Sequence, residues 1–288
     1  DVVVNASFSN QHYPITLDLL QHGLNVLTEK PFAKSRNECE TLIKTAKANN
    51  AVLAVFQQTF YAPIYQKAQA VLASGILGKI EQISIRYNGF SRRWDWQTLQ
   101  NRLGGGLYNN GPHAIGLGLG FLGFDENISV LYAKCACTAL TSGDGDDYAK
   151  VLFTAPAKPL IDVEVLSDDA YADYAVKIKG GKGTYVSTQS DYKYTYIIDG
   201  ENPPRPYVEG TLRKENGDPC YCSETLIKHE ESGKFEGTPF DVGTSLLYED
   251  LYFAITQGRK MMITPEYAAQ IIGIIETAHA LSPLPCKY

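Results

Sequence analysis

Residues 25–56, NVLTEKPFAKSRNECETLIKTAKANNAVLAVF, decide the fold class of this chain. Two short apolar runs, residues 25–28 and 51–56, lie on either side of an amphipathic segment. Within that segment Ser35-Arg-Asn-Glu38 is a capping box, which predicts a helix whose Leu42, Ile43 and Ala46 share one face. Strand, helix and strand with short connections predict a parallel α/β unit.

The same pattern continues toward the N-terminus. Val2-Val3-Val4 is a β-branched run of the kind found inside parallel sheets, and residues 13–22 predict a helix that Gly23 ends. Three strands are about half of a doubly wound domain. We therefore expect the sequence to lack a preceding half, made of two βα units of roughly 30 residues each.

After residue 57 the predicted elements change from alternating helices and strands to strands in succession. A helix over residues 63–74 precedes the strands, and two helices near residues 244–257 and 265–281 close the chain, the second opened by Thr264-Pro265-Glu266. The predicted strands cover residues 79–88, 128–138, 148–154, 160–165, 175–179 and 192–198. This succession predicts a mostly antiparallel open sheet with flanking helices.

Tyrosines mark one strand of that sheet. Tyr192, Tyr194 and Tyr196 alternate, so they share a strand face. The face is either a half-buried sheet surface or a subunit interface, in which tyrosine is enriched. We favour the interface and expect a homo-oligomer, a dimer or tetramer, formed through the C-terminal sheet.

Composition limits the partners. The 288 residues carry a formal net charge of −6 and are 44% hydrophobic and 20% charged, as in globular proteins. The acidic balance argues against nucleic-acid binding, which needs a basic surface. No run approaches the ~18–20 apolar residues of a membrane helix, and no signal-peptide pattern is present, so we expect a cytoplasmic protein without a membrane partner.

The cysteine pairs offer a metal-site alternative. Cys135-x-Cys137 and Cys220-x-Cys222 could together hold zinc, but structural zinc sites usually place two to four residues between paired cysteines. We expect each pair to lie on one face of a strand, and we expect no metal.

Two glycine-rich stretches resemble nucleotide loops without fitting them. Gly118-Leu-Gly-Phe-Leu-Gly123 has the G-x-G-x-x-G spelling, but it follows a predicted helix and runs toward a strand, whereas a dinucleotide loop follows a strand and opens a helix. Gly104-Gly-Gly106 lacks the following Lys, Ser or Thr of a phosphate loop. We therefore reject the first as a cofactor site and interpret the second as a turn.

Two stretches contain candidate catalytic residues. Lys30 lies in Thr28-Glu-Lys-Pro31 at the carboxyl end of a parallel strand, where α/β sheets bind ligands. It is either a surface lysine or a group that orients a substrate hydroxyl, with Glu29 holding its ammonium. Asn109 and His113 are four residues apart and share a helical face, and histidine exchanges protons near neutral pH.

Together these pieces resemble the glucose-fructose oxidoreductase and inositol dehydrogenase (GFO/IDH/MocA) family of NAD(P)-dependent sugar and polyol oxidoreductases. The resemblance spans the chain and is most specific where the Glu-Lys-Pro and Gly-Gly-Gly-to-His elements occur together. The matching stretches are Asp1-Val-Val-Val4, Ser9-Asn-Gln-His12, Glu29-Lys-Pro31, Gly75-Ile-Leu-Gly-Lys-Ile80, Trp94 or Trp96, Gly104-Gly-Gly106, Gly111-Pro-His113 and Thr264-Pro-Glu266.

The resemblance implies a role for each matching residue. Lys30 would contact the reacting hydroxyl, and His113 would be the general base in alcohol oxidation, with Asn109 as the third catalytic residue. The residues implied to line the NAD or NADP cofactor are Ser7, Ser9, Asn10, His12, Glu29 and Lys30. The residues expected at the sugar or polyol substrate are Arg92, Trp94, Trp96, Tyr108 and Asn109; the alternative for the tryptophan loop is a subunit contact.

Three departures from the family pattern stand out. The family's glycine fingerprint and ribose-binding acid precede the position that matches Asp1. Asn109 replaces an aspartate found in many members and supplies no negative charge. Thr59-Phe60 stands where the family often has paired arginines, which puts anchoring of the cofactor or substrate there in doubt.

The sequence therefore predicts an α/β plus α+β protein. Residues 1–57 would be the C-terminal half of an NAD(P)-binding Rossmann domain, and residues 58–288 a substrate-binding and oligomerisation domain. We expect hydride transfer between nicotinamide and a secondary alcohol carbon. The alternatives are a non-catalytic dinucleotide or sugar sensor of the same fold, or an N-terminally truncated inactive fragment.

Overall fold

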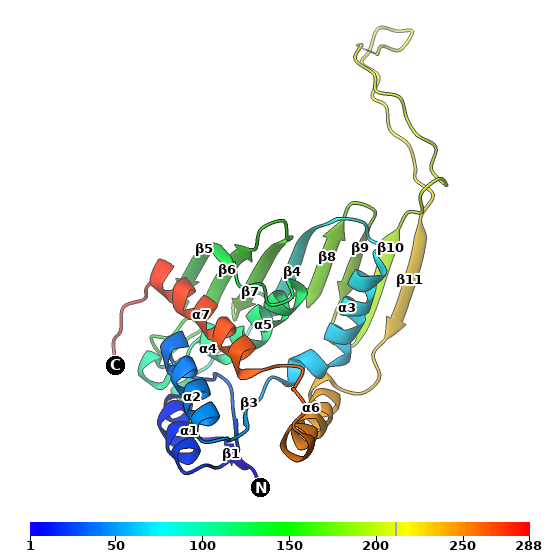
Figure 1. Cartoon of the computed structure of the whole chain (residues 1–288). Coiled ribbons are helices and arrows are strands. Elements are labelled where there is room, and N and C mark those ends of the chain that lie inside the picture. Colours follow the sequence, from blue (N-terminus) through cyan, green and yellow to red (C-terminus); the bar gives the residue numbers. More distant parts are fainter. Residues whose placement is uncertain (211) are drawn as a thin grey trace.

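The computed structural model describes residues 1–210 and 212–288, which form two sheets (Figure 1). One sheet has three strands in the order β1-β2-β3. The other has eight strands in the order β11-β10-β9-β8-β4-β7-β6-β5. Both predicted sheet types are confirmed.

The small sheet is parallel throughout. Strands β1 (Val3–Asn5), β2 (Val26–Thr28) and β3 (Leu53–Val55) are linked by helices α1 (His12–Gln21) and α2 (Arg36–Ala48). The Ser35 side chain accepts a hydrogen bond from the Glu38 N–H, as the capping box predicts. Because the three strands run parallel and in register, their carboxyl ends, Asn5, Thr28 and Val55, meet at one edge.

The large sheet follows helix α3 (Pro63–Ser74) and is mostly antiparallel. Only the central pair, β4 (Ile80–Asn88) with β7 (Leu160–Leu166), is parallel within the described residues. The remaining strands are β5 (Ser129–Ala136), β6 (Tyr148–Thr154), β8 (Val176–Gly180), β9 (Gly183–Ser187), β10 (Asp191–Tyr196) and β11 (His229–Lys234).

Two of these strands were not predicted. Strand β9 is short and begins at a glycine, and β11 reads His-Glu-Glu-Ser-Gly-Lys, which has no apolar alternation. Pairing with β10 stabilises both strands, so their structure depends on a neighbour rather than on local pattern. Between β10 and β11 the chain runs away from the body of the molecule (Figure 1).

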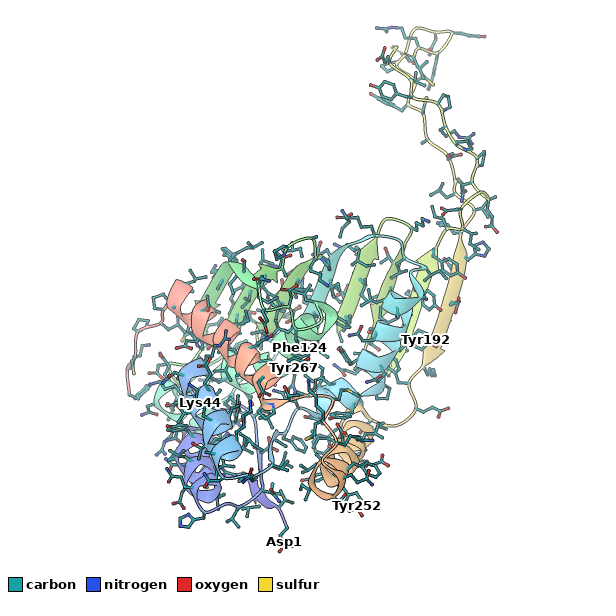
Figure 2. The ribbon with its side chains drawn as sticks, in the orientation of Figure 1. Asp1, Lys44, Phe124, Tyr192, Tyr252 and Tyr267 are labelled. Atoms are coloured by element: carbon teal, nitrogen blue, oxygen red, sulfur yellow. The ribbon has the colours of Figure 1, made fainter. Side chains whose placement is uncertain are left out.

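Helices cover one face of the large sheet (Figure 1). They are α3, α5 (Gly111–Phe121) and α7 (Pro265–Leu281), while α6 (Pro239–Gln257) begins five residues earlier than predicted because Thr238 caps it. Short helices η1 (Ser9–Gln11), η2 (Gln58–Tyr61), η3 (Trp96–Thr98), η4 (Gln100–Arg102) and α4 (Gly106–Asn109) lie in the connections. Phe124 and Tyr267 stack at 4.0 Å where α7 meets the end of α5 (Figure 2).

The tyrosine face of β10 is the face that α3 covers. Tyr194 is buried, and the ammonium of Lys67 on α3 lies 4.5 Å from the centre of the Tyr192 ring. Adjacent tyrosine rings stack along the strand, with centroids 6.5 Å and 5.9 Å apart. These contacts are those of a half-buried sheet face packed inside the chain, so the tyrosines themselves do not form a free interface.

The glycine and cysteine expectations have mixed outcomes. Gly118 and Gly120 lie inside α5, where they pack closely against neighbouring side chains, so the rejected motif is a helix-packing element. The expectation for the cysteines was wrong. Cys135 is buried on β5 while Cys137 is exposed beyond it, and Cys220 and Cys222 lie outside any strand.

Candidate active site

Lys30, at the edge of the small sheet, contacts Asn109, at the end of α4. The Lys30 ammonium donates hydrogen bonds to the backbone oxygen of Asn109 at 3.0 Å and to its Oδ1 at 3.4 Å. Lys30 follows β2, and Asn109 ends α4, 79 residues later. The structure thus brings together two of the three predicted catalytic residues. The Glu29 carboxylate does not hold the ammonium as expected but accepts the backbone N–H of Lys30.

His113 lies on α5, one turn beyond Asn109, and is buried. Its Nδ1 lies 2.6 Å from the hydroxyl of Thr59 on η2. The ring of Tyr87, from β4, stacks on the imidazole with centroids 6.0 Å apart. These partners fix the plane and the orientation of the imidazole.

The electrostatics of the site keep His113 neutral. Burial, reinforced by the positive charge of Lys30, lowers the pKa of His113 from 6.5 to about 3. Burial also lowers the pKa of Lys30, and Arg93 adds to the decrease while Glu29 opposes it. A neutral imidazole beside a lysine can accept a proton from a hydroxyl that the lysine orients.

The carboxyl edge of the small sheet has unsatisfied polar atoms. Within the described residues, Asn10 Oδ1, Thr28 Oγ1, Gln57 Oε1 and Gln58 Oε1 are buried without hydrogen-bond partners. Thr28, Gln57 and Gln58 lie at or just after the ends of β2 and β3, and Asn10 lies in η1, which follows β1. Because buried polar groups are normally paired, this edge fits a polar ligand such as the nicotinamide and ribose of a dinucleotide.

Other predicted cofactor residues make internal contacts. His12 is buried, and its Nδ1 and Nε2 lie 2.7 Å and 3.2 Å from the backbone oxygens of Pro31 and Ser7. Ser7 donates its hydroxyl to Asn5 Oδ1. His12 therefore holds the loop after β1 against the loop after β2, and contact of Ser7, Ser9 and Asn10 with a cofactor stays a prediction.

The tryptophan loop packs against the segment that follows β1. Trp96 packs edge-on against Phe8, with ring centres 5.1 Å apart, and Trp94 is 76% exposed. These rings and Arg102 line a cavity of about 360 Å³. Arg92 is exposed nearby in sequence, and its contact with a substrate stays a prediction.

Tyr108 lines a cavity to which Lys30 does not contribute. Its hydroxyl donates to the backbone oxygen of Lys34 at 2.8 Å, and its ring packs against His279 at 5.2 Å. With Asp146 these residues line a cavity of about 310 Å³. The structure gives Tyr108 a structural contact, and its predicted role at the substrate stays untested.

The Gly104–106 turn is held by an aspartate rather than shaped around a phosphate. Asp146 accepts the backbone N–H of Leu107 at 2.8 Å and lies 3.1 Å from His279 Nε2. Gly105 has φ +104°, and a Cβ there would lie 2.5 Å from Asp146 Oδ1. The glycines therefore allow close packing that positions α4 and Asn109.

A further cavity opens at the end of β4. It has a volume of about 410 Å³, and Tyr87 and Asn110 are among its lining residues. Arg86, Asn88 and Tyr174 add polar groups to its wall. This cavity lies at the ends of β4 and β7, and His113 is not among its lining residues.

Sequence reasoning missed Thr59 and Tyr87 as site residues. The resemblance places Thr59 only at the position of a family arginine, and the sequence pattern predicts Tyr87 only as part of a strand. The one available signal was the position of Thr59 just after a parallel strand, at the edge where ligands bind.

Two family models match the chain. Residues 1–57 match the oxidoreductase family with an NAD-binding Rossmann fold, and residues 65–186 match the GFO/IDH/MocA C-terminal domain. In the described residues no helix meets the length and apolarity needed to cross a membrane. No group of three or more His, Cys, Asp or Glu there is arranged to hold a metal ion.

Similar proteins include both curated relatives and solved structures. Uncharacterized oxidoreductase C26H5.09c of Schizosaccharomyces pombe is 25% identical over 213 residues, which are 72% of this chain but only 57% of that protein. The scyllo-inositol 2-dehydrogenase (NADP(+)) IolW of Bacillus subtilis is 24% identical, over 96% of this chain and 75% of that one. The NAD-binding protein from Listeria innocua has the same fold, with a TM-score of 0.77 at 17% identity, over 98% of this chain and 79% of its own.

Proposed function

Because the chain belongs to the GFO/IDH/MocA family of oxidoreductases and its residues 1–57 match part of the family's NAD-binding Rossmann domain, we propose that it transfers hydride between a nicotinamide and a secondary alcohol. The substrate class we propose is a sugar or cyclic polyol. The observation that carries this proposal is the contact between Lys30 and Asn109 one helical turn from His113.

The cofactor, NAD or NADP, would lie against the carboxyl edge of the small sheet. Asn10, Thr28 and Gln57 offer unpaired polar atoms there for the nicotinamide amide and ribose hydroxyls. When bound, the dinucleotide supplies the hydride acceptor for alcohol oxidation.

The protein's own residues would handle the oxygen and its proton. The Lys30 ammonium, already 3.0 Å from one oxygen acceptor, would donate to the substrate hydroxyl and stabilise negative charge that develops on it. His113 would accept the hydroxyl proton at Nε2, which has no hydrogen-bond partner among the described residues. The exposed Trp94 and the guanidinium of Arg92 would contact the sugar ring.

The test is turnover of the whole chain with NAD and NADP against a panel of sugars and inositols. Removal of a general base typically costs about 10²–10⁴-fold in rate, so His113→Asn should lose nearly all kcat. Lys30→Met should do the same, whereas Lys44→Met, an exposed lysine on α2 (Figure 2), serves as the matched control. Wild-type kcat in either site variant contradicts the proposal.

A second candidate function is a dinucleotide or sugar sensor. The neutral Asn109 and the lowered pKa of His113 favour it, because neither stabilises an imidazolium during catalysis. Calorimetric binding of NAD or NADP without turnover of any alcohol in the panel would support the sensor. If the chain neither binds nor turns over, the inactive-fragment alternative holds.

We also propose that a second copy of the chain covers the helix-free face of the large sheet. That face carries an ion-pair network in which Arg86 and Lys150 each contact Asp162 and Glu164. Light scattering of the wild-type chain and of a charge-reversed Lys150→Glu variant tests it: a dimer or tetramer that dissociates in the variant supports the proposal, and a monomeric wild type contradicts it.

A further inference from the structure

A buried carboxylate holds the start of α4. Asp146 Oδ2 accepts the backbone N–H of Leu107 at 2.8 Å, and the backbone oxygen of Asp146 accepts the N–H of Gly106 at 2.5 Å. These are the first two N–H groups of the helix, and N–H groups at a helix start have no partner within the helix. Asp146 is buried, so it fixes where α4 begins.

His279 holds that carboxylate in turn. Its Nε2 lies 3.1 Å from Asp146 Oδ1, the carboxylate oxygen that Leu107 does not use. Because a carboxylate only accepts hydrogen bonds, Nε2–H is the donor. His279 comes from α7, and its ring also packs against the ring of Tyr108, with centroids 5.2 Å apart. Helix α7 therefore supports α4 both through the Asp146 carboxylate and through Tyr108.

The other end of α4 is where Lys30 binds. Asn109 is the last of the four residues of this helix, and its backbone oxygen accepts a hydrogen bond from the Lys30 ammonium at 3.0 Å. The bonds at the start of α4 and the bond at its end therefore belong to one turn, so a displacement at Gly106 also displaces the Asn109 oxygen. The Tyr108 hydroxyl donates to the backbone oxygen of Lys34 at 2.8 Å, which joins the same turn to the segment that follows Lys30.

We propose that Asp146 and His279 are positioning residues of the active site: together they set the place of the Asn109 backbone oxygen, and through it the place of the Lys30 ammonium. In this role neither residue touches the substrate. The proposal rests on the proposed dehydrogenase function, in which Lys30 orients the substrate hydroxyl. Because the shorter contact of Lys30 is to a backbone oxygen, the position of the α4 turn governs it, and the pair that holds this turn governs Lys30.

The reactivity of Lys30 gives a test that needs no turnover. The whole chain is treated briefly with acetic anhydride, and mass spectrometry compares acetylation of Lys30 with that of Lys44, an exposed lysine on α2. The acceptor at Asn109 favours the ammonium form, which does not react. A hydrogen bond to a charged group is typically strong enough to change an equilibrium about tenfold or more, so Asp146→Ala and His279→Leu should each raise the Lys30-to-Lys44 ratio about tenfold.

Conservative replacements separate the hydrogen bonds from the volume of the side chains. Asp146→Asn keeps an oxygen for the Leu107 N–H, and His279→Gln keeps a side-chain N–H in the place of Nε2–H. Both variants should return the acetylation ratio toward the wild-type value. If the ratio stays high in His279→Gln, side-chain packing rather than the hydrogen bond sets α4, and the proposal is wrong.

The matched control is Asp250→Ala. Asp250 is a buried aspartate on α6 that accepts the backbone N–H of Met262 at 2.8 Å, and among the described residues it makes no hydrogen bond to α4. Its loss removes the same kind of bond at another place. Asp250→Ala should therefore lower the stability of the chain in urea but leave the acetylation ratio unchanged.

Turnover gives a second measurement. A misplacement of about 1 Å at a catalytic group can cost about 100-fold in rate, so Asp146→Ala and His279→Leu should lower kcat about 100-fold with little change in KM. A purely structural role predicts a loss of stability with wild-type kcat per folded molecule, as we expect for Asp250→Ala.

The failures of the two proposals are distinguishable. If Asp146→Ala and His279→Leu are folded by circular dichroism and keep the wild-type acetylation ratio, the positioning role is wrong, even when the wild type oxidises a polyol. If Asp146→Ala does not fold, His279→Leu decides, because it leaves the Asp146 carboxylate on α4. If the wild type oxidises no alcohol, the proposed function fails, while the ratio still shows whether the pair positions Lys30.

Discussion

Replacement of Gly118 by alanine tests the assignment of the G-x-G-x-x-G spelling to helix packing. Gly118 lies inside α5, where alanine by itself would favour the helix by about 1 kcal/mol. The added Cβ would lie 2.6 Å from Ile161 Cγ2 and 2.7 Å from Phe153 Cζ, and both side chains are fully buried in the sheet. Overpacking of this kind typically costs about 1–3 kcal/mol, so after the helical gain we expect the free energy of unfolding to fall by up to about 2 kcal/mol.

The matched control is Gly273→Ala on α7. There the nearest atoms to a new Cβ belong to the flexible side chain of Arg36, at 3.4 Å or more. We therefore expect that variant to gain about 0.5–1 kcal/mol. Urea denaturation with an unchanged m-value gives both free energies.

Two results would refute this reasoning. One is a Gly118→Ala variant as stable as Gly273→Ala, because the close contacts would then have no cost. The other is a loss of NAD or NADP binding in Gly118→Ala without a loss of stability, because a phosphate-binding glycine loop would behave in that way.

Three further predictions concern the site and the cysteines. Asn109→Asp should raise the pKa of His113 above its value of about 3, because a carboxylate next to the Lys30 ammonium favours the imidazolium; an NMR titration measures this, and an unchanged pKa contradicts it. Since His113 has a folded-state pKa below its ordinary 6.5, the unfolded chain takes up the proton first, and the wild type should lose stability as the pH falls from about 6.5 to about 3. His113→Asn should lose less stability over that interval, as measured by urea denaturation at each pH, and an equal loss in both proteins contradicts the assignment. Ellman's reagent should modify the exposed thiols of the native chain and spare the buried pair, whose pKa values burial raises. The exposed thiols are Cys137, Cys220, Cys222 and Cys286, and the buried ones are Cys39 and Cys135.

Much of the fold could be predicted because its signals are local. Apolar runs gave the three parallel strands, and Ser35 and Thr264 marked helix starts that the structure confirms. Strand β11 could not be predicted, because its charged sequence is ordered by pairing with β10. The same applies to Tyr192, whose alternation identified a face but not the helix that covers it.

The site, like the fold, has residues that local sequence motifs predict and residues that only tertiary contacts bring together. Lys30 and Asn109 could be proposed from motifs, and the structure places them in contact. Thr59 and Tyr87 could not, because their relation to His113 depends on η2, β4 and α5 meeting in three dimensions. The residues next to Thr59 and Tyr87 in the sequence form no motif that would predict a contact with His113.

An aspartate at position 109 would both accept a hydrogen bond from the Lys30 ammonium and place a negative charge near His113. Asn109 keeps the first role and loses the second. The shorter contact of Lys30 is to the backbone oxygen of Asn109, at 3.0 Å, and a backbone oxygen is present whatever the side chain. The position of the ammonium can therefore survive the substitution. What changes is the charge near His113: with a neutral amide there, Lys30 is the charge that acts on the ring, and it acts against an imidazolium. The hydroxyl of Thr59, 2.6 Å from Nδ1, then holds the neutral ring in place, and a carboxylate at position 109 would be the group that stabilises its protonated form.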